Sequence, residues 1–311
     1  MPDLPTGIHK KRLLGNTGIK VSPICYGCAS AYARDLISDQ TAIELFHRAY
    51  QLGVSFFDTG RSYGKAEARV GQALKASSEI RRESIVLATK FDLQEVGGGH
   101  AERLDLDWAR RSVETSLKTM GIDYVDVLFV HEPNPLALND DNLFSFFDDL
   151  KRQGIVKASG VNTFDAEVAE RVAREKLLDV VMLNHNIAVR RDETIQKLYN
   201  AGVGVVAGQA LAQGLFLNDL FKVSVKKDVW YLMRAFGSKA SRSLFFKARR
   251  YRFLNKLKGV DAAQLALKFV LDNPFVASAA LSACSLEHLT RDVEALDATI
   301  PQDALIRVKN S

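Results

Sequence analysis

The chain has 311 residues, of which 47% are hydrophobic and 25% charged, and its formal net charge is +5. This composition is that of a globular protein, and the length suits a single barrel domain over residues 1–311. We find no apolar run long enough to span a bilayer and no secretory signal. The sequence therefore predicts a cytoplasmic protein without membrane segments.

The positive charge is concentrated in one segment. Residues 222–258 contain twelve Lys or Arg and one acidic residue, which gives this segment +11 and leaves −6 for the remainder. A generally basic surface is therefore excluded. We expect either a lid over an anionic ligand or a solvated helix face, and we favour both over nucleic-acid or membrane-surface binding.

Strand-like and helix-like runs alternate along the chain after a hairpin predicted over 11–22, turned at 15–18. The expected strands cover 21–28, 54–57, 85–89, 125–130, 155–161, 180–183, 203–207 and 276–281. The expected helices cover 40–52, 67–75, 106–120, 143–153, 165–175, 192–200, 261–270 and 286–296. Residues 211–259 interrupt the alternation, and we expect a long functional loop with helical pieces there.

Alternating strands and helices favour parallel β-α-β units, and eight such units predict an α/β fold of the (β/α)8 TIM-barrel type. An open, doubly wound sheet is the alternative. The turn Gly27-Cys28-Ala29-Ser30 after the first strand lacks the G-x-G-x-x-G pattern with which such sheets bind dinucleotides. We therefore expect the closed barrel.

Three cysteines are too few for a disulfide scaffold, and we expect reduced thiols. Cys25 and Cys28 form a C-x-x-C pair within a predicted strand, where residues three apart point to opposite faces. No second pair of Cys or His lies nearby in the sequence. The sequence therefore predicts neither a metal site nor a redox-active pair.

Polar residues stand at the carboxyl ends of three predicted strands. Asp58 follows 54–57, Lys90 follows 85–89 and His131 follows 125–130, while Tyr63 lies in the loop after Asp58. The carboxyl ends of all barrel strands meet on one face, where TIM-barrel enzymes carry out their chemistry. We therefore expect these four side chains to converge.

The four side chains suit proton transfer to or from a carbonyl oxygen. A free tyrosine has a pKa near ~10, and an ammonium such as Lys90 is expected to lower the pKa of Tyr63. Asp58 can hold Lys90 in place, and His131 can orient the carbonyl. Because the set has neither a nucleophile nor a metal, a nicotinamide cofactor is the natural source of reducing equivalents.

Several sequence blocks resemble those of the aldo-keto reductase family. They are Phe56-Phe57-Asp58-Thr59-Gly60-Arg61-Ser62-Tyr63-Gly64, Ala88-Thr89-Lys90, and the segments 121–131, 154–161 and 211–215. The resemblance covers nearly the whole chain. It implies a (β/α)8 barrel that uses NAD(P)(H) to reduce aldehydes and ketones, or to oxidise alcohols or sugar lactols. It also implies that Tyr63 is the general acid/base, with Asp58, Lys90 and His131 as its partners.

The resemblance places nicotinamide-binding residues at the ends of later strands, and this chain departs from the family there. Asn162-Thr163 stands where Ser-Asn is usual, and Met182 stands where Gln is usual, with Asn184 and Asn186 nearby. Gly208 aligns with the aromatic residue that commonly stacks on the nicotinamide. The candidate cofactor-binding residues in this part of the chain are Asn162, Asn184, Gln209, Leu211, Gln213 and Gly214.

Residues 282–292 are similar in layout to the family segment that binds the adenosine phosphate. Ser282, Cys284 and His288 replace its usual Lys or Arg, while Arg291 and Asp292 complete the candidates. A helix N-terminus can still bind a phosphate. We favour NADP(H) over NAD(H) because the resemblance implies the cofactor that the family commonly uses. We hypothesise that Arg242, Arg249 and Arg250 supply the missing positive charge.

The expected partner is a small carbonyl or sugar substrate, and the candidates for lining its pocket are Tyr32, Phe91, Glu132, Asn134 and the 211–259 segment. The alternative function is that of the potassium-channel β subunits that the family includes, which would bind the cofactor as a redox sensor. Fold alone does not separate the two functions.

Overall fold

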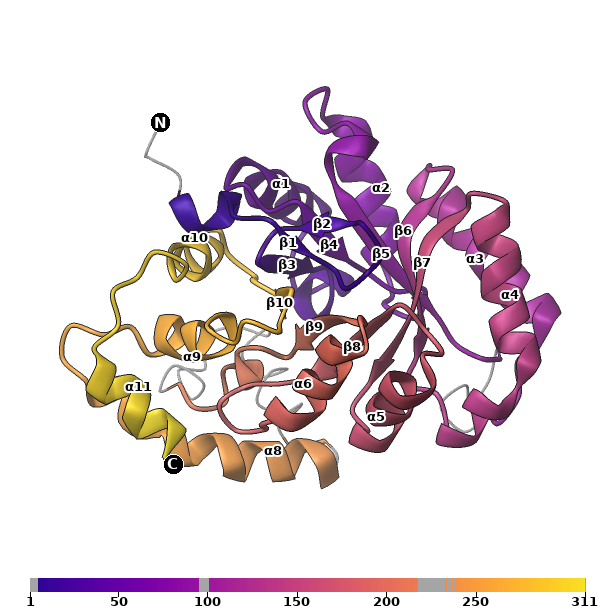
Figure 1. Ribbon diagram of the computed structural model, residues 1–311. Coiled ribbons are helices and arrows are strands. Elements are labelled where there is room, and N and C mark those ends of the chain that lie inside the picture. Colours follow the sequence, from indigo (N-terminus) through magenta and orange to yellow (C-terminus); the bar gives the residue numbers. More distant parts are fainter. Residues whose placement is uncertain (1–4, 95–100, 218–232, 234–235, 238, 311) are drawn as a thin grey trace.

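Eight parallel strands close into a barrel in the order β10-β3-β4-β5-β6-β7-β8-β9 in the computed structural model (Figure 1). The structure describes residues 5–94, 101–217, 233, 236, 237 and 239–310. The barrel strands are β3 (Ile24–Gly27), β4 (Phe56–Asp58), β5 (Val86–Phe91), β6 (Val125–His131), β7 (Val156–Thr163), β8 (Val180–Asn184), β9 (Gly204–Gly208) and β10 (Ser278–Leu281). This architecture confirms the predicted (β/α)8 barrel.

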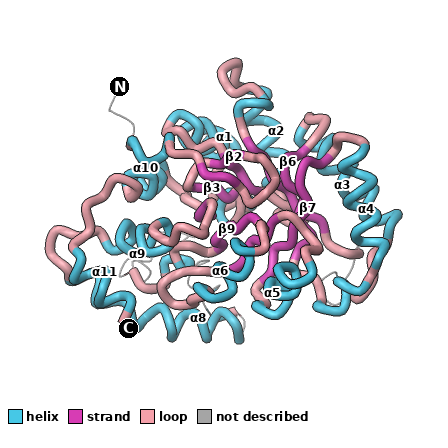
Figure 2. The backbone as a smooth tube through the Cα atoms, in the orientation of Figure 1, coloured by secondary structure: helices cyan, strands magenta, loops and turns pink. Residues whose placement is uncertain are grey.

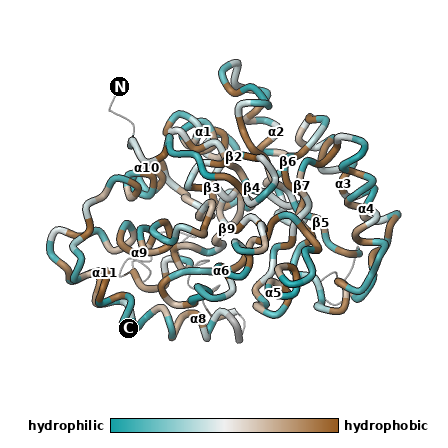
Figure 3. The backbone as a smooth tube through the Cα atoms, viewed as in Figure 1, coloured by the Kyte–Doolittle hydropathy of each residue, from teal (hydrophilic) through white to brown (hydrophobic). Residues whose placement is uncertain are grey.

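Helices surround the strands (Figure 2). They are α1 (Asp39–Gln51), α2 (Ala66–Ala76), α3 (Leu106–Met120), α4 (Asp141–Arg152), α5 (Ala166–Glu175), α6 (Asp192–Asn200), α8 (Lys239–Arg249), α9 (Ala262–Leu271), α10 (Leu286–Glu294) and α11 (Gln302–Lys309). Hydrophobic and hydrophilic colours alternate along many of these helices, as expected for helices with one buried face (Figure 3).

Capping residues set several helix boundaries where the sequence placed them. The side chains of Asp165 and Asp261 accept hydrogen bonds from the first backbone N–H groups of α5 and α9, as predicted. Gly121 ends α3 in the left-handed conformation, with φ of 67°. These local signals fix where a helix begins or ends, independently of the barrel.

The predicted hairpin is present as β1 (Arg12–Leu13) paired antiparallel with β2 (Lys20–Val21). Leu14 and Val21 pack among the inward-facing side chains of the barrel, and the Asn16 N–H donates to the carbonyl of Gly202, just before β9. The hairpin therefore closes the amino-terminal end of the barrel and leaves the carboxyl end for the site.

The first predicted strand was wrong in its extent. A single strand was expected over 21–28, but the chain leaves the hairpin at Val21 and enters β3 at Ile24. Pro23 has no N–H to donate to a strand ladder. The Ser22 hydroxyl instead donates to the carbonyl of Ile24 and accepts from the N–H groups of Ser55 and Phe56.

The described part of the 211–259 segment contains helical pieces, as expected: α8 and the 3-10 helix η8 (Arg250–Lys256). Figure 1 shows α8 along the outer edge of the molecule. Helix α11 was not predicted. It buries Ala304, Leu305 and Val308, and Arg307 stacks on the Phe253 ring of η8 at 4.1 Å from the centroid.

Among the described residues, no helix combines the length and the apolar character needed to cross a membrane.

Candidate active site

The inward-facing positions at the carboxyl end of the barrel form one ring. Side chains alternate along a strand, and Phe56, Ala88, Phe129 and Met182 belong to the cluster inside the barrel. The next inward position on each strand lies two residues closer to its carboxyl end. On the eight strands these positions hold Gly27, Asp58, Lys90, His131, Asn162, Asn184, Gly208 and Ser282. The predicted Asp, Lys and His therefore share this ring.

Lys90 and Asp58 form a buried ion pair at the ring. The Lys90 ammonium lies 2.5 and 2.6 Å from the two carboxylate oxygens of Asp58 and donates to the carbonyl of Thr59 at 2.8 Å. The two residues are 1% and 5% exposed. Burial pulls the pKa of Lys90 down, but the charge and hydrogen bond of the Asp58 carboxylate together with Tyr63 raise that pKa above its ordinary value. Lys90 is therefore held as a fixed cation.

Tyr63 lies over this cation. The Lys90 nitrogen is 4.7 Å from the centroid of the phenol ring. The Tyr63 N–H donates to Gly60, and an added Cβ at Gly60 would lie 3.3 Å from the ring. Gly64 has φ of 53° and comes so close to the Ala33 carbonyl that a Cβ would lie 2.6 Å from it. The two glycines thus let the loop pack tightly and hold the ring.

The expected effect on the Tyr63 phenol needs a correction. We predicted that Lys90 lowers the pKa of Tyr63 below its ordinary value. Burial raises that pKa more than the Lys90 ammonium lowers it, and the Asp58 carboxylate also raises it. The phenol is therefore held in its protonated form. The prediction was wrong because the sequence pattern identified the charge partner of Tyr63 but not how far the phenol is desolvated.

His131 joins the set from β6. Its Nε2 lies 3.5 Å from the Tyr63 hydroxyl, and the two rings meet edge to face at 78°. Its Nδ1 lies 3.2 Å from Oδ1 of Asp92, a residue that the sequence reasoning missed. Asp92 stands two residues after Lys90, so the two-residue period of a strand would have placed it on the same face.

Backbone strain gathers on this face of the barrel. Among the described non-glycine residues, six have positive φ, and five of them follow the carboxyl ends of barrel strands. They are Ser30 after β3, Glu132 after β6, and Gln209, Ala212 and Gln213 after β9. Such conformations cost of order 1–3 kcal/mol each and cluster at functional sites. Their position supports this end of the barrel as the site.

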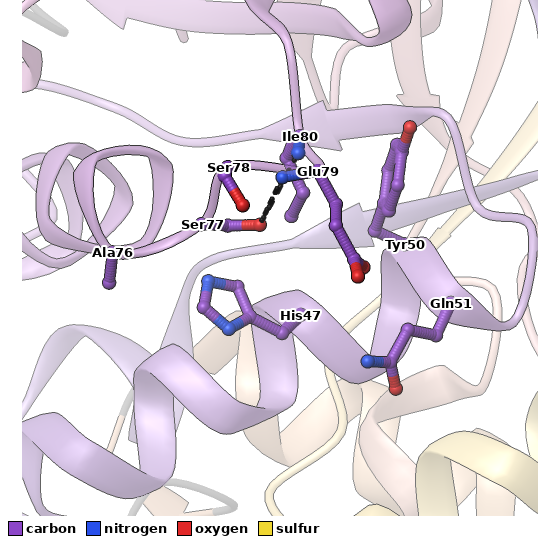
Figure 4. Close-up of a pocket in the computed structure, with 8 residues that line it drawn as sticks. All are labelled: His47, Tyr50, Gln51, Ala76, Ser77, Ser78, Glu79 and Ile80. Carbon is purple, nitrogen blue, oxygen red and sulfur yellow. Dashed lines mark hydrogen bonds between the residues drawn. The ribbon is translucent and has the colours of Figure 1, made fainter.

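A hollow of about 210 Å³ lies elsewhere, on the outer helical ring (Figure 4). It is bounded by His47, Tyr50 and Gln51 of α1 and by residues 76–80 at and after the end of α2. His47 donates from Nε2 to the carbonyl of Ala73 at 2.8 Å, which gives its ring a structural role. None of the four converging residues lines this hollow.

The sequence of residues 23–311 matches the model of the Aldo/keto reductase family. The chain belongs to this family. Its curated relatives include the L-galactose dehydrogenase of Arabidopsis thaliana, 26% identical over 92% of this chain and 87% of the relative. They also include a rice protein (Oryza sativa subsp. japonica) named "Probable voltage-gated potassium channel subunit beta", 27% identical over 91% of this chain and 90% of the relative.

A solved aldo-keto reductase of Bacillus halodurans matches the structure with a TM-score of 0.74, covering 97% of this chain and 95% of that chain. Its sequence is 22% identical, so this likeness concerns the fold. Membership of the family makes the protein an oxidoreductase of a family that generally uses NAD(P)H.

The nicotinamide candidates lie on neighbouring strands of the same ring. Asn162 is 6% exposed and donates from Nδ2 to the carbonyl of Met182 at 3.3 Å, which leaves its side-chain oxygen as an acceptor. The side-chain oxygen of Asn184 is buried and has no hydrogen-bond partner. Two acceptors at this edge fit the amide group of a nicotinamide, which offers two N–H donors.

Gly208 keeps space open beside these acceptors. It pairs with Asn184 in the β8–β9 register, and a Cβ there would lie 3.5 Å from the Met182 side chain, an ordinary contact. The next residues carry the left-handed turn that contains Gln209, Leu211, Gln213 and Gly214. Consecutive residues with such backbone angles can form anion-binding concavities, and this turn is the candidate contact for a cofactor diphosphate.

The candidates after β10 are spread over different environments. Ser282 donates from its hydroxyl to the carbonyl of Gly27 at 2.7 Å, at the rim of the barrel. Ser285 caps α10 by accepting the N–H of His288. Cys284 is half-buried and His288 is exposed. The amino end of α10 can still attract a phosphate through its first N–H groups.

Arg291 and Asp292 are paired with each other rather than presented to a ligand. The guanidinium of Arg291 donates to Oδ1 of Asp292 at 3.0 Å, and Asp292 is 2% exposed. In the basic segment, Arg242 donates to the carbonyl of Phe236 and Arg249 to the carbonyl of Leu217. These arginines therefore have protein partners, and Arg250 is exposed.

Two of the candidate pocket residues belong to the core instead. Phe91 is 1% exposed and lies edge to face with Phe146 and Phe147 of α4, so its expected place in the pocket was wrong. It follows Lys90 and must point outward, away from the barrel axis. Tyr32 is equally buried, with its ring edge to face with Tyr26.

Proposed function

We propose that this aldo-keto reductase transfers a hydride between NAD(P)(H) and the carbonyl carbon of an aldehyde, ketone or sugar, with Tyr63 as general acid/base. The observation that carries the proposal is the contact of the Tyr63 phenol with two groups. The buried Lys90 ammonium lies 4.7 Å from its ring centroid, and Nε2 of His131 lies 3.5 Å from its hydroxyl. This arrangement serves proton transfer at one oxygen atom.

A bound nicotinamide supplies or accepts the hydride. Tyr63 donates its phenolic proton to the oxygen that becomes the alcohol, or takes that proton back in the reverse direction. Lys90 stabilises the phenolate through its nearby positive charge, and Asp58 keeps Lys90 charged and in place. His131 fixes the position of the reacting oxygen.

Replacement of Tyr63 by Phe tests the proposal. The variant keeps the ring and loses the proton donor, so turnover should fall by at least ~100-fold while cofactor binding is retained. The control is Tyr199→Phe, an exposed tyrosine on α6. A Tyr63→Phe enzyme with turnover close to that of the unmodified protein would refute the assigned role.

We further propose NADP(H) as the preferred cofactor, with Asn162 and Asn184 at the nicotinamide and residues 282–292 near the adenosine phosphate. The cofactor commonly used in the family supports the preference for NADP(H) over NAD(H). The basic segment would add electrostatic attraction, which salt screens. Titration with NADPH and with NADH at low and moderate salt, on the unmodified protein and on a variant with Arg242, Arg249 and Arg250 replaced by Ala, tests both points.

A second candidate function is that of a redox-sensing subunit of a larger assembly. The likeness to the rice channel β-subunit relative favours it, whereas the complete set of Asp58, Tyr63, Lys90 and His131 favours the enzyme. Tight cofactor retention with negligible multiple turnover across a broad panel of carbonyl compounds would favour the sensor.

A further inference from the structure

Glu132 directly follows His131 at the end of β6, and its backbone conformation is unusual. Its φ is 43°, although a residue before a proline, here Pro133, normally takes an extended conformation. The Glu132 N–H donates to the carbonyl of Asn162 on β7 at 2.7 Å, and Pro133 is buried. The barrel therefore holds this residue on one side and the core holds it on the other.

The conformation brings the Glu132 side chain back toward the inside of the barrel. Successive side chains on a strand point to opposite faces, so the residue after the inward-facing His131 would normally point outward. Instead, Oε1 of Glu132 lies 3.8 Å from Nε2 of His131. The same nitrogen lies 3.5 Å from the Tyr63 hydroxyl. The carboxylate therefore stands next to the place where the proposed function holds the carbonyl oxygen.

The Glu132 carboxylate is available to a ligand. In the part of the chain that the structure describes, no Lys or Arg pairs with it, and its side chain is 46% exposed. At 3.8 Å, the imidazole of His131 is outside hydrogen-bond range. The neighbouring carboxylate, that of Asp92, faces the other ring nitrogen at 3.2 Å. Glu132 is thus the carboxylate on the Nε2 side, where the substrate would bind.

A carboxylate accepts hydrogen bonds and does not donate them, so the ligand must supply a donor. In the proposed reaction, the carbonyl oxygen contacts the Tyr63 hydroxyl and Nε2 of His131. The carbon next to the carbonyl carbon is then the nearest substrate atom that can carry a donor toward Glu132. A hydroxyl group on that carbon is neutral, small and able to donate.

We propose that Glu132 determines substrate specificity by accepting a hydrogen bond from a hydroxyl group on the carbon next to the carbonyl carbon. The inference rests on the proposed function and narrows its substrates to α-hydroxy aldehydes and α-hydroxy ketones, the class to which open-chain sugars belong. In the reduction, the carbonyl carbon receives the hydride and its oxygen receives the Tyr63 proton. The products are a vicinal diol and the oxidised cofactor, and the oxidation is the reverse.

Two ketones of matched shape test the proposal. Hydroxyacetone and butan-2-one differ by a hydroxyl in place of a methyl group on the carbon next to the carbonyl carbon. A neighbouring hydroxyl also activates a carbonyl chemically, so the decisive quantity is the change in the ratio of their kcat/KM values between proteins. Glu132→Ala should lower the ratio of hydroxyacetone to butan-2-one by about tenfold or more, as for a lost hydrogen bond to a charged group.

Two further variants control this comparison. Glu132→Gln keeps an acceptor without the charge, so it should lower the ratio less than Glu132→Ala does. Glu193→Ala removes an exposed carboxylate in the first turn of α6 and should leave the ratio unchanged. An equal fall of the ratio in Glu193→Ala and Glu132→Ala would assign the effect to net charge and overturn the inference.

Binding gives a second measurement that does not depend on turnover. With the oxidised nicotinamide cofactor present, neither ketone is reduced, and titrations followed by ligand-observed NMR give the two Kd values. The preference for hydroxyacetone should shrink in Glu132→Ala as it does in the kinetics. An unchanged preference, or no binding of hydroxyacetone, would overturn the inference. Full turnover in Tyr63→Phe would instead refute the proposed function, and the Kd ratio would still decide the role of Glu132.

Discussion

The carboxylate of Glu67 accepts a hydrogen bond from the hydroxyl of Thr89 at 2.7 Å, and both residues are buried. Glu67 is in the first turn of α2, just after the loop that carries Tyr63, and Thr89 directly precedes Lys90 on β5. Burial raises the pKa of Glu67, and the bond to Thr89 opposes that rise. This contact joins the Tyr63 loop to the strand that carries Lys90.

Thr89→Val should therefore destabilise the protein, because it removes the donor while keeping the shape of the side chain. We expect a loss of about 1–3 kcal/mol in the free energy of unfolding, as for a buried polar group that loses its partner. Urea denaturation measures the loss. Thr119→Val, at an exposed position on α3, is the matched control, and equal stability of the two variants would contradict the prediction.

Lys90→Met should be among the most damaging replacements in the barrel. It leaves the Asp58 carboxylate buried without its partner, which typically costs about 3–5 kcal/mol. The double variant Asp58→Leu with Lys90→Met removes both charges and should recover much of this loss. A double-mutant cycle by chemical denaturation tests the coupling, and additive effects of the two changes would show that the pair is not energetically linked.

Arg69→Lys should loosen the loop over 29–38. The buried guanidinium of Arg69 donates to the carbonyls of Tyr32, Arg34 and Ile37 and pairs with Asp39. An ammonium cannot reach all four groups, because it lacks the fork of five N–H donors. Amide hydrogen exchange in this loop should become roughly tenfold faster. The exposed replacement Arg174→Lys should leave the exchange unchanged.

Asp292 should make stability fall as pH rises. Burial raises its pKa from an ordinary value of 3.8 to about 6. The folded state therefore binds more protons than the unfolded state between about pH 4 and 6, and stability decreases over that window. The free energy of unfolding of the unmodified protein relative to Asp292→Asn should fall by up to ~3 kcal/mol from pH 4 to pH 7.

Urea denaturation of the cofactor-free proteins at several pH values measures this difference. Glu287→Gln, an exposed replacement on the same helix, is the control for a lost carboxyl group. A difference between the unmodified protein and Asp292→Asn that stays constant from pH 4 to 7 would exclude the buried carboxyl as the cause.

If the proposed function holds, the site should prefer neutral or cationic carbonyl compounds to anionic ones. Carboxylates of Asp92 and Glu132 lie 3.2 and 3.8 Å from the two nitrogens of His131. Their repulsion of a phosphate or carboxylate on the substrate should lower kcat/KM by roughly fivefold or more. Measuring kcat/KM for an aldehyde and for its phosphorylated form tests the effect. Glu132→Gln should reduce the difference in kcat/KM between the two compounds. Equal kcat/KM for the two compounds would contradict the prediction.

Local signals in the sequence determined most of the architecture and the set of converging residues. Strands and helices alternate in hydrophobic pattern, and capping residues such as Asp165 and Gly121 mark helix ends without help from distant residues. Asp58, Lys90 and His131 stand at or next to the carboxyl ends of their strands, and a parallel barrel brings such ends together whatever its exact packing. The roles assigned to them and to the cofactor residues remain predictions.

Only the tertiary structure decided the environment of each group. The sequence supplied a cation for Tyr63, but the raised pKa of the phenol depends on how much water the surrounding elements exclude. The bond between Asp92 and His131 depends on the register of β5 against β6. Desolvation and strand register both depend on residues that are far apart in the chain, so they cannot be predicted from a local sequence pattern.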